Sequence, residues 1–153
     1  MYHATMPTDA LVTFRDVMLE TKSFGFAQAR EKAWELGGLV RSMMCGDKGL
    51  VSVAAEGYQA PGVVVVHTSD AAVAGKFIKH GTQIAAGVPF MIGEPSDTKT
   101  FRIGLFGLDK LKSPHMTASL LREAIDAAVP DEVVRNLSGY IRTDSALKKA
   151  MPK

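Results

Sequence analysis

The fold rests most clearly on one segment in the second half of the chain, Thr100-Phe101-Arg102-Ile103-Gly104-Leu105-Phe106-Gly107. Residues 100–105 are mostly aromatic, aliphatic or β-branched and stand between turn residues, which predicts a β-strand. Arg102 interrupts this apolar run, and a bare charge in apolar surroundings costs several kcal/mol. We therefore expect Arg102 to meet an anion, either a carboxylate or a phosphate.

The segments on either side alternate between helix and strand. Apolar residues at helical spacing predict helices over residues 8–21, 26–44, 72–78 and 116–128, the first capped by Thr5 or a neighbour and carrying Pro7 in its first turn. Short β-branched or small apolar runs predict strands over residues 50–53, 63–66 and 83–86, with 63–66 as a central strand. This order predicts an α/β fold, an α+β sandwich in which helices cover one face of an open sheet. A long helical segment precedes that sandwich.

Length and composition suit one domain. At 153 residues and 46% hydrophobic content the chain can bury an ordinary core. We expect residues 1–129 to form this domain. Residues 130–153 are more polar but keep apolar residues at helical spacing, which predicts a helical or partly disordered C-terminal extension.

Charge and cysteine content argue against several classes of protein. The 18 basic and 16 acidic residues give a net charge of +2 and are interspersed, so we expect no nucleic acid partner. No apolar run approaches the ~20 residues needed to cross a membrane and no leader is evident, so we expect a cytoplasmic protein. Cys45 is the only cysteine, which excludes an internal disulfide and a cysteine-based zinc site.

Three segments together resemble the class V pyridoxal-phosphate-dependent aminotransferases. They are Tyr2-His3-Ala4-Thr5-Met6-Pro7, Gly81-Thr82-Gln83-Ile84-Ala85-Ala86-Gly87 and residues 100–107. The resemblance is to the alanine:glyoxylate and serine:pyruvate branch. It covers residues 1–129 and concerns the small C-terminal domain of the fold type I enzymes. It implies pyridoxal phosphate as cofactor, and a dimer whose active sites lie at the subunit interface.

The resemblance also implies roles for three residues. Tyr2 and Thr5 would donate hydroxyl hydrogen bonds to the cofactor phosphate of the neighbouring subunit, and Arg102 would bind the substrate carboxylate through its planar guanidinium. The implied substrates are a small amino acid, alanine or serine, and a small 2-oxo acid, glyoxylate or pyruvate. From the residues alone, Arg102 could instead be a salt-bridged arginine at a strand edge, and Tyr2 and Thr5 a frayed end and a helix cap.

The histidines and the cysteine show no catalytic pattern. His67, His80 and His115 lie among turns without metal-ligand spacing, which favours surface or capping roles, and we predict no metal site. For His3 we expect a structural role. Cys45 stands at the end of a predicted helix and does not resemble the mobile-loop nucleophile of the related cysteine desulfurases, so we expect a buried thiol.

Chemistry of this family also needs a lysine that forms a Schiff base with the cofactor, and the resemblance puts that lysine upstream of Tyr2. None of the eleven lysines here stands in the expected setting, because Lys22, Lys32, Lys76 and Lys79 fall on predicted helices and Lys99 in a loop. We therefore expect no catalytic residue in this chain and no transamination by it alone.

The expected partner is an aminotransferase large domain or a homodimer partner. The chain would then be a gene fragment, a product of internal initiation or one half of a split enzyme. The alternative is a non-catalytic module that binds a carboxylate or dimerises.

Overall fold

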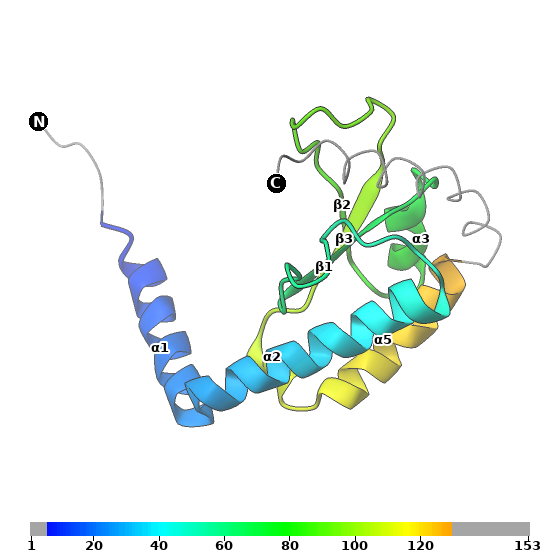
Figure 1. Ribbon diagram of the computed structural model, residues 1–153. Helices are drawn as coiled ribbons and strands as arrows, with labels where there is room; N and C mark the ends of the chain where they lie inside the picture. Colours follow the sequence, from blue (N-terminus) through cyan, green and yellow to red (C-terminus); the bar gives the residue numbers. More distant parts are fainter. Residues whose placement is uncertain (1–5, 130–153) are drawn as a thin grey trace, which may run out of the picture.

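The computed structural model describes residues 6–129, and residues 1–5 and 130–153 lie outside that range. The predictions for Tyr2, His3, Thr5 and the C-terminal extension therefore fall outside the described residues. Five α-helices, one π-helical turn and three strands make up the described part (Figure 1). In chain order they are α1 (Thr8–Phe24), α2 (Phe26–Arg41), η1 (Ser42–Asp47), β1 (Val63–His67), α3 (Val73–Lys79), β2 (Ala85–Ala86), β3 (Thr100–Gly104), α4 (Leu108–Leu111) and α5 (Pro114–Ala128).

The three strands form a small antiparallel open sheet in the order β1-β3-β2, which confirms the mixed α/β class. Residues 63–66 form a strand as predicted, but β3 and not β1 is central in this sheet. On the edge of β1 that does not pair with β3, Ser52 makes an isolated antiparallel bridge to Val66. The predicted strand over residues 50–53 is thus reduced to this bridge. The predicted strand over residues 83–86 is reduced to the two residues of β2.

One face of the sheet is buried against the helices. Val64 pairs with Ile103 and Val66 with Phe101, and all four side chains are buried. Phe101 packs against Phe77 of α3, with ring centroids 5.8 Å apart. Helices α2 and α5 pack against each other beneath the sheet (Figure 1) and complete the core with the buried side chains Leu36, Val40, Ala118, Leu121, Ala124 and Ile125. Burial of this apolar face is the main stabilising term of the fold.

A close approach between α2 and the chain before β1 sets the distance of the helix from the sheet. Gly37 is buried, and a Cβ atom there would lie 2.5 Å from the carbonyl oxygen of Pro61. Such a contact is impossible for a real side chain, so the absence of a Cβ lets the helix reach this position. Arg41, one turn later, donates from Nη2 to the carbonyl of Ala60 at 2.8 Å and fastens the same segment.

The predicted second helix continues into η1, whose wider turns end the run at Asp47. Two ion pairs join this end to α5. Lys48 Nζ lies 3.0 Å from Asp126 Oδ1, and Arg122 Nη2 lies 2.9 Å from Asp47 Oδ2. Both pairs are at least partly exposed, so each contributes little on its own.

Helix α1 projects from the body and none of its residues is buried (Figure 1). Helix α1 confirms the helix predicted over residues 8–21 and ends three residues later, at Phe24. Pro7 holds the N-cap position and not the first turn, and no side-chain hydrogen bond caps the helix. Gly25 separates α1 from α2 with φ 101° and ψ 120°, a conformation that only glycine adopts without strain.

The two later predicted helices are confirmed. Helix α3 ends at Lys79 with His80 as its C-cap, and α5 runs from Pro114 to Ala128. The four-residue α4 was not predicted. Between residues 6 and 129 no helix has the length and apolar character required to cross a membrane.

Candidate carboxylate-binding site

Arg102 lies on the face of the sheet that the helices leave open. Along β3 the side chains alternate, with Phe101 and Ile103 buried and Arg102 and Gly104 exposed. Because β3 is central, Arg102 has a neighbour on each side, Val65 of β1 and Ala85 of β2. The strand thus places a single guanidinium in the middle of a small apolar surface.

The expectation that Arg102 needs an anion to offset the cost of a charge in apolar surroundings is wrong. The residue is exposed, so its charge carries little desolvation cost. The alternative of a salt-bridged arginine at a strand edge finds no support either. Arg102 is on the central strand, and among residues 6–129 its side chain makes no hydrogen bond or ion pair. Its five N–H donors are available to a ligand.

A shallow hollow of about 570 Å³ opens beside Arg102. Arg102, Gln83 and five apolar residues line it, namely Val63, Ile84, Ala85, Gly104 and Phe106. Most of them belong to the open face by the alternation of the strands. The volume lies within the range of roughly 300–1,000 Å³ found for small-molecule sites.

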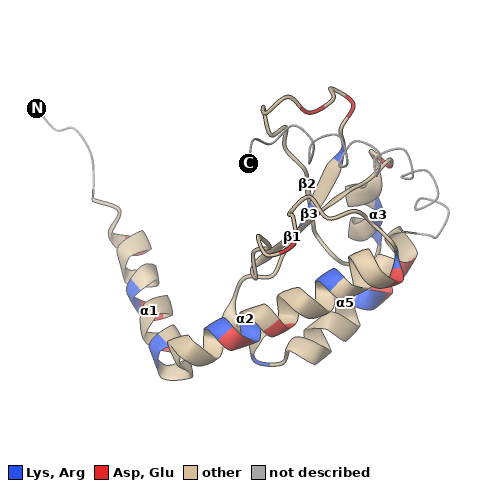
Figure 2. Ribbon diagram, viewed as in Figure 1, with Lys and Arg blue, Asp and Glu red and all other residues tan. Residues whose placement is uncertain are grey.

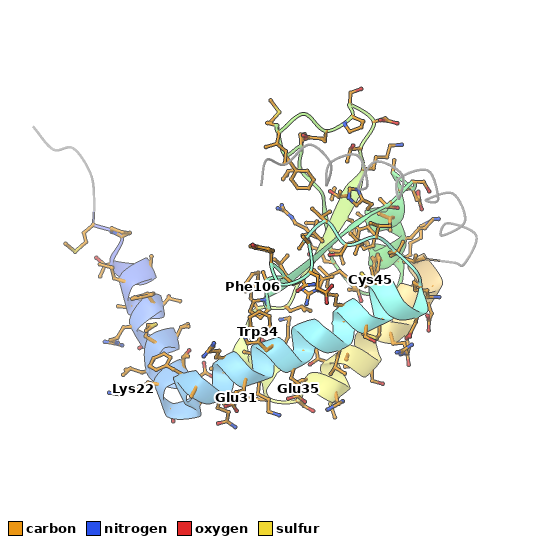
Figure 3. The ribbon with its side chains drawn as sticks, viewed as in Figure 1. Lys22, Glu31, Trp34, Glu35, Cys45 and Phe106 are labelled. Atoms are coloured by element: carbon orange, nitrogen blue, oxygen red, sulfur yellow. The ribbon has the colours of Figure 1, made fainter. Side chains whose placement is uncertain are left out.

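Phe106 is the aromatic wall of this hollow and is 68% exposed. Its ring rests on the backbone of Gly62, where an added Cβ would lie 2.6 Å from Phe106 Cε1. The amide of Leu105 donates to the carbonyl of Gly62 at 2.9 Å and holds the two segments together. Figure 3 shows Phe106 and Trp34 on the side of the body toward α1.

The charge pattern around the hollow favours one negative group. Among residues 6–129, Arg102 is the only charged residue in its lining, so no described carboxylate competes there for the guanidinium. Over the rest of the ribbon, basic and acidic residues alternate along α1, α2 and α5 (Figure 2). A planar guanidinium binds a carboxylate through two parallel hydrogen bonds, which fixes the orientation of the ligand. The hollow is therefore suited to a monocarboxylate.

Tyr2 and Thr5 lie outside the described residues, so their predicted roles stay predictions. The lysines fall as predicted, with Lys22 on α1, Lys32 on α2, and Lys76 and Lys79 on α3. Lys99 lies in the loop directly before β3. None of these lysines lines the hollow beside Arg102.

A second hollow, of about 670 Å³, lies between the start of α3 and the loop over residues 87–99. The carboxylate of Glu94 braces this loop by accepting the backbone N–H groups of Phe90, Met91 and Ile92 at 2.5–2.9 Å. These bonds lower the pKa of Glu94 to about 2. On the α3 side, Asp70 Oδ2 lies 2.7 Å from Lys76 Nζ, and this hydrogen bond lowers the pKa of Asp70. The two acids of its described lining are thus already engaged, whereas Lys99 also lines this hollow and its side chain makes no hydrogen bond or ion pair among residues 6–129.

Cys45, His80 and His115 lie outside both hollows. Cys45 lies in η1, partly buried against the core, and burial raises the pKa of its thiol. The thiol is thus a poor nucleophile. His80 caps α3, and His115 Nε2 lies 3.1 Å from Glu35 Oε1. No group of three His, Cys, Asp or Glu side chains between residues 6 and 129 could hold a metal ion.

Three residues with a part in these hollows were missed by the sequence analysis. Gln83 stands two residues before Ala85 of β2, and Phe106 stands four residues after Arg102 of β3, each just outside its strand. This even spacing was the signal that could have found them. Glu94 gave no such signal, because a carboxylate that accepts three loop amides is recognised only once the loop is folded.

Searches of the whole chain against protein-family models and against curated proteins find no match.

Proposed function

We propose that the chain acts as the small domain of a pyridoxal-phosphate-dependent aminotransferase of the class V type, in which Arg102 binds the substrate carboxylate. The proposed substrates are alanine or serine and glyoxylate or pyruvate, as the sequence resemblance implies. One observation carries the proposal. Arg102 is exposed and lacks a partner among residues 6–129, and it is the one charged residue in the described lining of a largely apolar hollow.

An arginine at this place suits a reaction with two alternating substrates. The amino acid and the 2-oxo acid both carry a carboxylate next to the reacting carbon, so one guanidinium can hold each in turn. The bidentate contact leaves only one orientation of the plane of the carboxylate. Since β3 is hydrogen-bonded on both sides, the backbone that carries Arg102 is rigid. Such support is what a positioning group requires.

Pyridoxal phosphate would supply the electron sink for the bond broken at the substrate carbon. In this proposal a large domain holds most of the cofactor and provides the lysine. Tyr2 and Thr5 would contribute hydroxyl donors to the phosphate of the neighbouring subunit. The described residues fit the substrate end of such a site and contain none of the groups proposed to hold the cofactor.

Helix α1 supports a two-part arrangement. Leu11, Phe14, Val17 and Leu19 are each at least half exposed, and no residue of the helix is buried. A single helix of this length is marginal in water without tertiary packing. A large domain that covers α1 would bury this apolar surface and bring the Tyr2 end of the chain toward the cofactor.

The test is reconstitution. The full chain is co-expressed with the large domain of a class V aminotransferase, and transfer from alanine to glyoxylate is compared with that of each part alone. Activity only in the mixture is the expected result. Arg102→Lys should raise the KM for alanine roughly tenfold or more and leave cofactor occupancy unchanged, because the lost contact belongs to the substrate. Arg15→Lys on α1 is the control.

Two outcomes would count against this role. Loss of bound cofactor in Arg102→Lys would mean that the arginine serves the cofactor and not the substrate. An unchanged KM would remove Arg102 from the site altogether.

The second candidate is a non-catalytic module that binds a carboxylate or dimerises. The exposed apolar surface of α1 is the observation that favours it, because a second copy could cover that surface as well as a large domain could. Sedimentation of the full chain with and without the large domain separates the two. A dimer that the large domain does not dissociate favours the module.

A further inference from the structure

The hollow beside Arg102 is lined by two kinds of group. Among the described lining residues the polar side chains are the guanidinium of Arg102 and the amide of Gln83. The others are apolar, and Phe106 is the aromatic ring among them. A ligand that used the whole hollow would carry one carboxylate and one apolar group.

The fold fixes the position of the Phe106 ring. Phe106 lies two residues beyond the end of β3 and four residues after Arg102, is exposed, and lines the same hollow as Arg102. The ring rests against Gly62, which has no side chain to displace it. An exposed aromatic ring held at a fixed place beside a cation is a surface on which an apolar or aromatic ligand group can pack.

We propose that this hollow selects carboxylates with an apolar or aromatic group over carboxylates the size of glyoxylate or acetate. The inference rests on the proposed function only in taking Arg102 as the carboxylate-binding group. It departs from the small substrates that the sequence resemblance implies, because serine and glyoxylate carry no apolar group for Phe106 to contact. A substrate with a longer apolar side chain can contact both Arg102 and Phe106.

Binding to the full chain without cofactor tests this inference. The probes are 3-phenylpropionate and propionate, which differ by one phenyl ring, and binding is followed by NMR shifts, including the Arg102 side-chain N–H signal. The phenyl compound should bind about tenfold tighter, which corresponds to about 1.4 kcal/mol. Phe106→Ala should remove this preference and leave propionate binding nearly unchanged.

Further variants keep the test independent of folding. Gly62→Ala displaces the ring without removing it and should also reduce the preference, whereas Phe106→Leu should keep part of it. Phe14→Ala is the matched control, because Phe14 is 64% exposed on α1 and Phe106 is 68% exposed. Arg102→Gln should weaken both acids, and 3-phenylpropanol, which lacks the carboxylate, should bind weakly to every variant.

Equal affinity for the two acids, or binding of neither, would overturn the inference. So would a preference that survives in folded Phe106→Ala, or an alcohol that binds as tightly as the acid. These results are separable from those of the reconstitution. A phenyl preference without transamination rejects the aminotransferase role alone, and transamination without the preference rejects only the apolar selectivity.

Discussion

The approach of α2 to the chain before β1 allows a test with two neighbouring glycines. Gly37 and Gly38 lie in the same helix interior, and replacement by alanine gains about 0.5–1 kcal/mol of helix stability at either position. The surroundings differ. A Cβ atom at Gly37 would lie 2.5 Å from the carbonyl oxygen of Pro61, whereas a Cβ atom at Gly38 would have no atom within 4 Å.

The two substitutions should therefore change stability in opposite directions. Gly38→Ala is expected to stabilise the protein. Gly37→Ala must move α2 away from Pro61, and such overpacking costs about 1–3 kcal/mol. The gain in helix propensity is common to both variants, so this cost is also the expected difference between them. At roughly 3 °C per kcal/mol, their melting temperatures should differ by roughly 3–9 °C.

The assay is urea and thermal unfolding of both variants and the parent chain, followed by circular dichroism. An unchanged dependence on urea concentration would show that the same surface is exposed on unfolding. If Gly37→Ala were as stable as Gly38→Ala, the helix would not lie against Pro61 as described. We would then revise the position of α2 relative to the sheet. The contact of Phe106 with Gly62 would need revision as well.

Three further predictions concern the core, the loop and the thiol. Phe101→Ala should lower the free energy of unfolding, measured in urea, by about 3–5 kcal/mol because the ring is fully buried. Arg102→Ala, at the next position, should change it by under about 0.5 kcal/mol because Arg102 is exposed. Equal effects would contradict the alternation of buried and exposed side chains along β3. The Glu94 carboxyl should titrate by NMR near pH 2 and not near 4.5. The stability that its hydrogen bonds to the loop contribute is therefore fully present above pH 4.5 and is lost as pH falls through about 2. A midpoint near 4.5 would mean that the three amides do not bind the carboxylate. Cys45 should react with iodoacetamide at pH 8 roughly tenfold more slowly in the folded than in the unfolded chain, and equal rates would show an exposed thiol.

Local patterns in the sequence predicted the long elements well. Helical spacing from Phe26 onward gave α2, and the run of four valines gave β1, because in both cases one face of the element is buried. The four residues of α4 are too few to show a helical period. The pairing of β3 with both other strands joins segments far apart in the chain, and no local pattern encodes it.

The sequence analysis singled out Arg102 for a reason that the fold does not support. The sequence analysis treated Arg102 as a charge within an apolar strand. The alternation of Phe101 and Ile103 around it already places its side chain on the opposite face, where water offsets the charge. Phe106 was quoted in the motif but was given no role, since its contact with Gly62 depends on the folded arrangement.

Gly25 is the single residue between α1 and α2, so a small change in its backbone angles moves the far end of α1 by a large distance. The 17 residues of α1 extend about 25 Å beyond this single joint, at 1.5 Å per residue. A rotation of about 10° at Gly25 therefore displaces the first turn of α1 by about 4 Å, while the body around α2 and the sheet stays where it is. The orientation of any partner bound to α1 relative to Arg102 thus depends on the two backbone angles of Gly25 and on the exposed ion pair, 3.7 Å long, between Glu20 of α1 and Lys112 of the body.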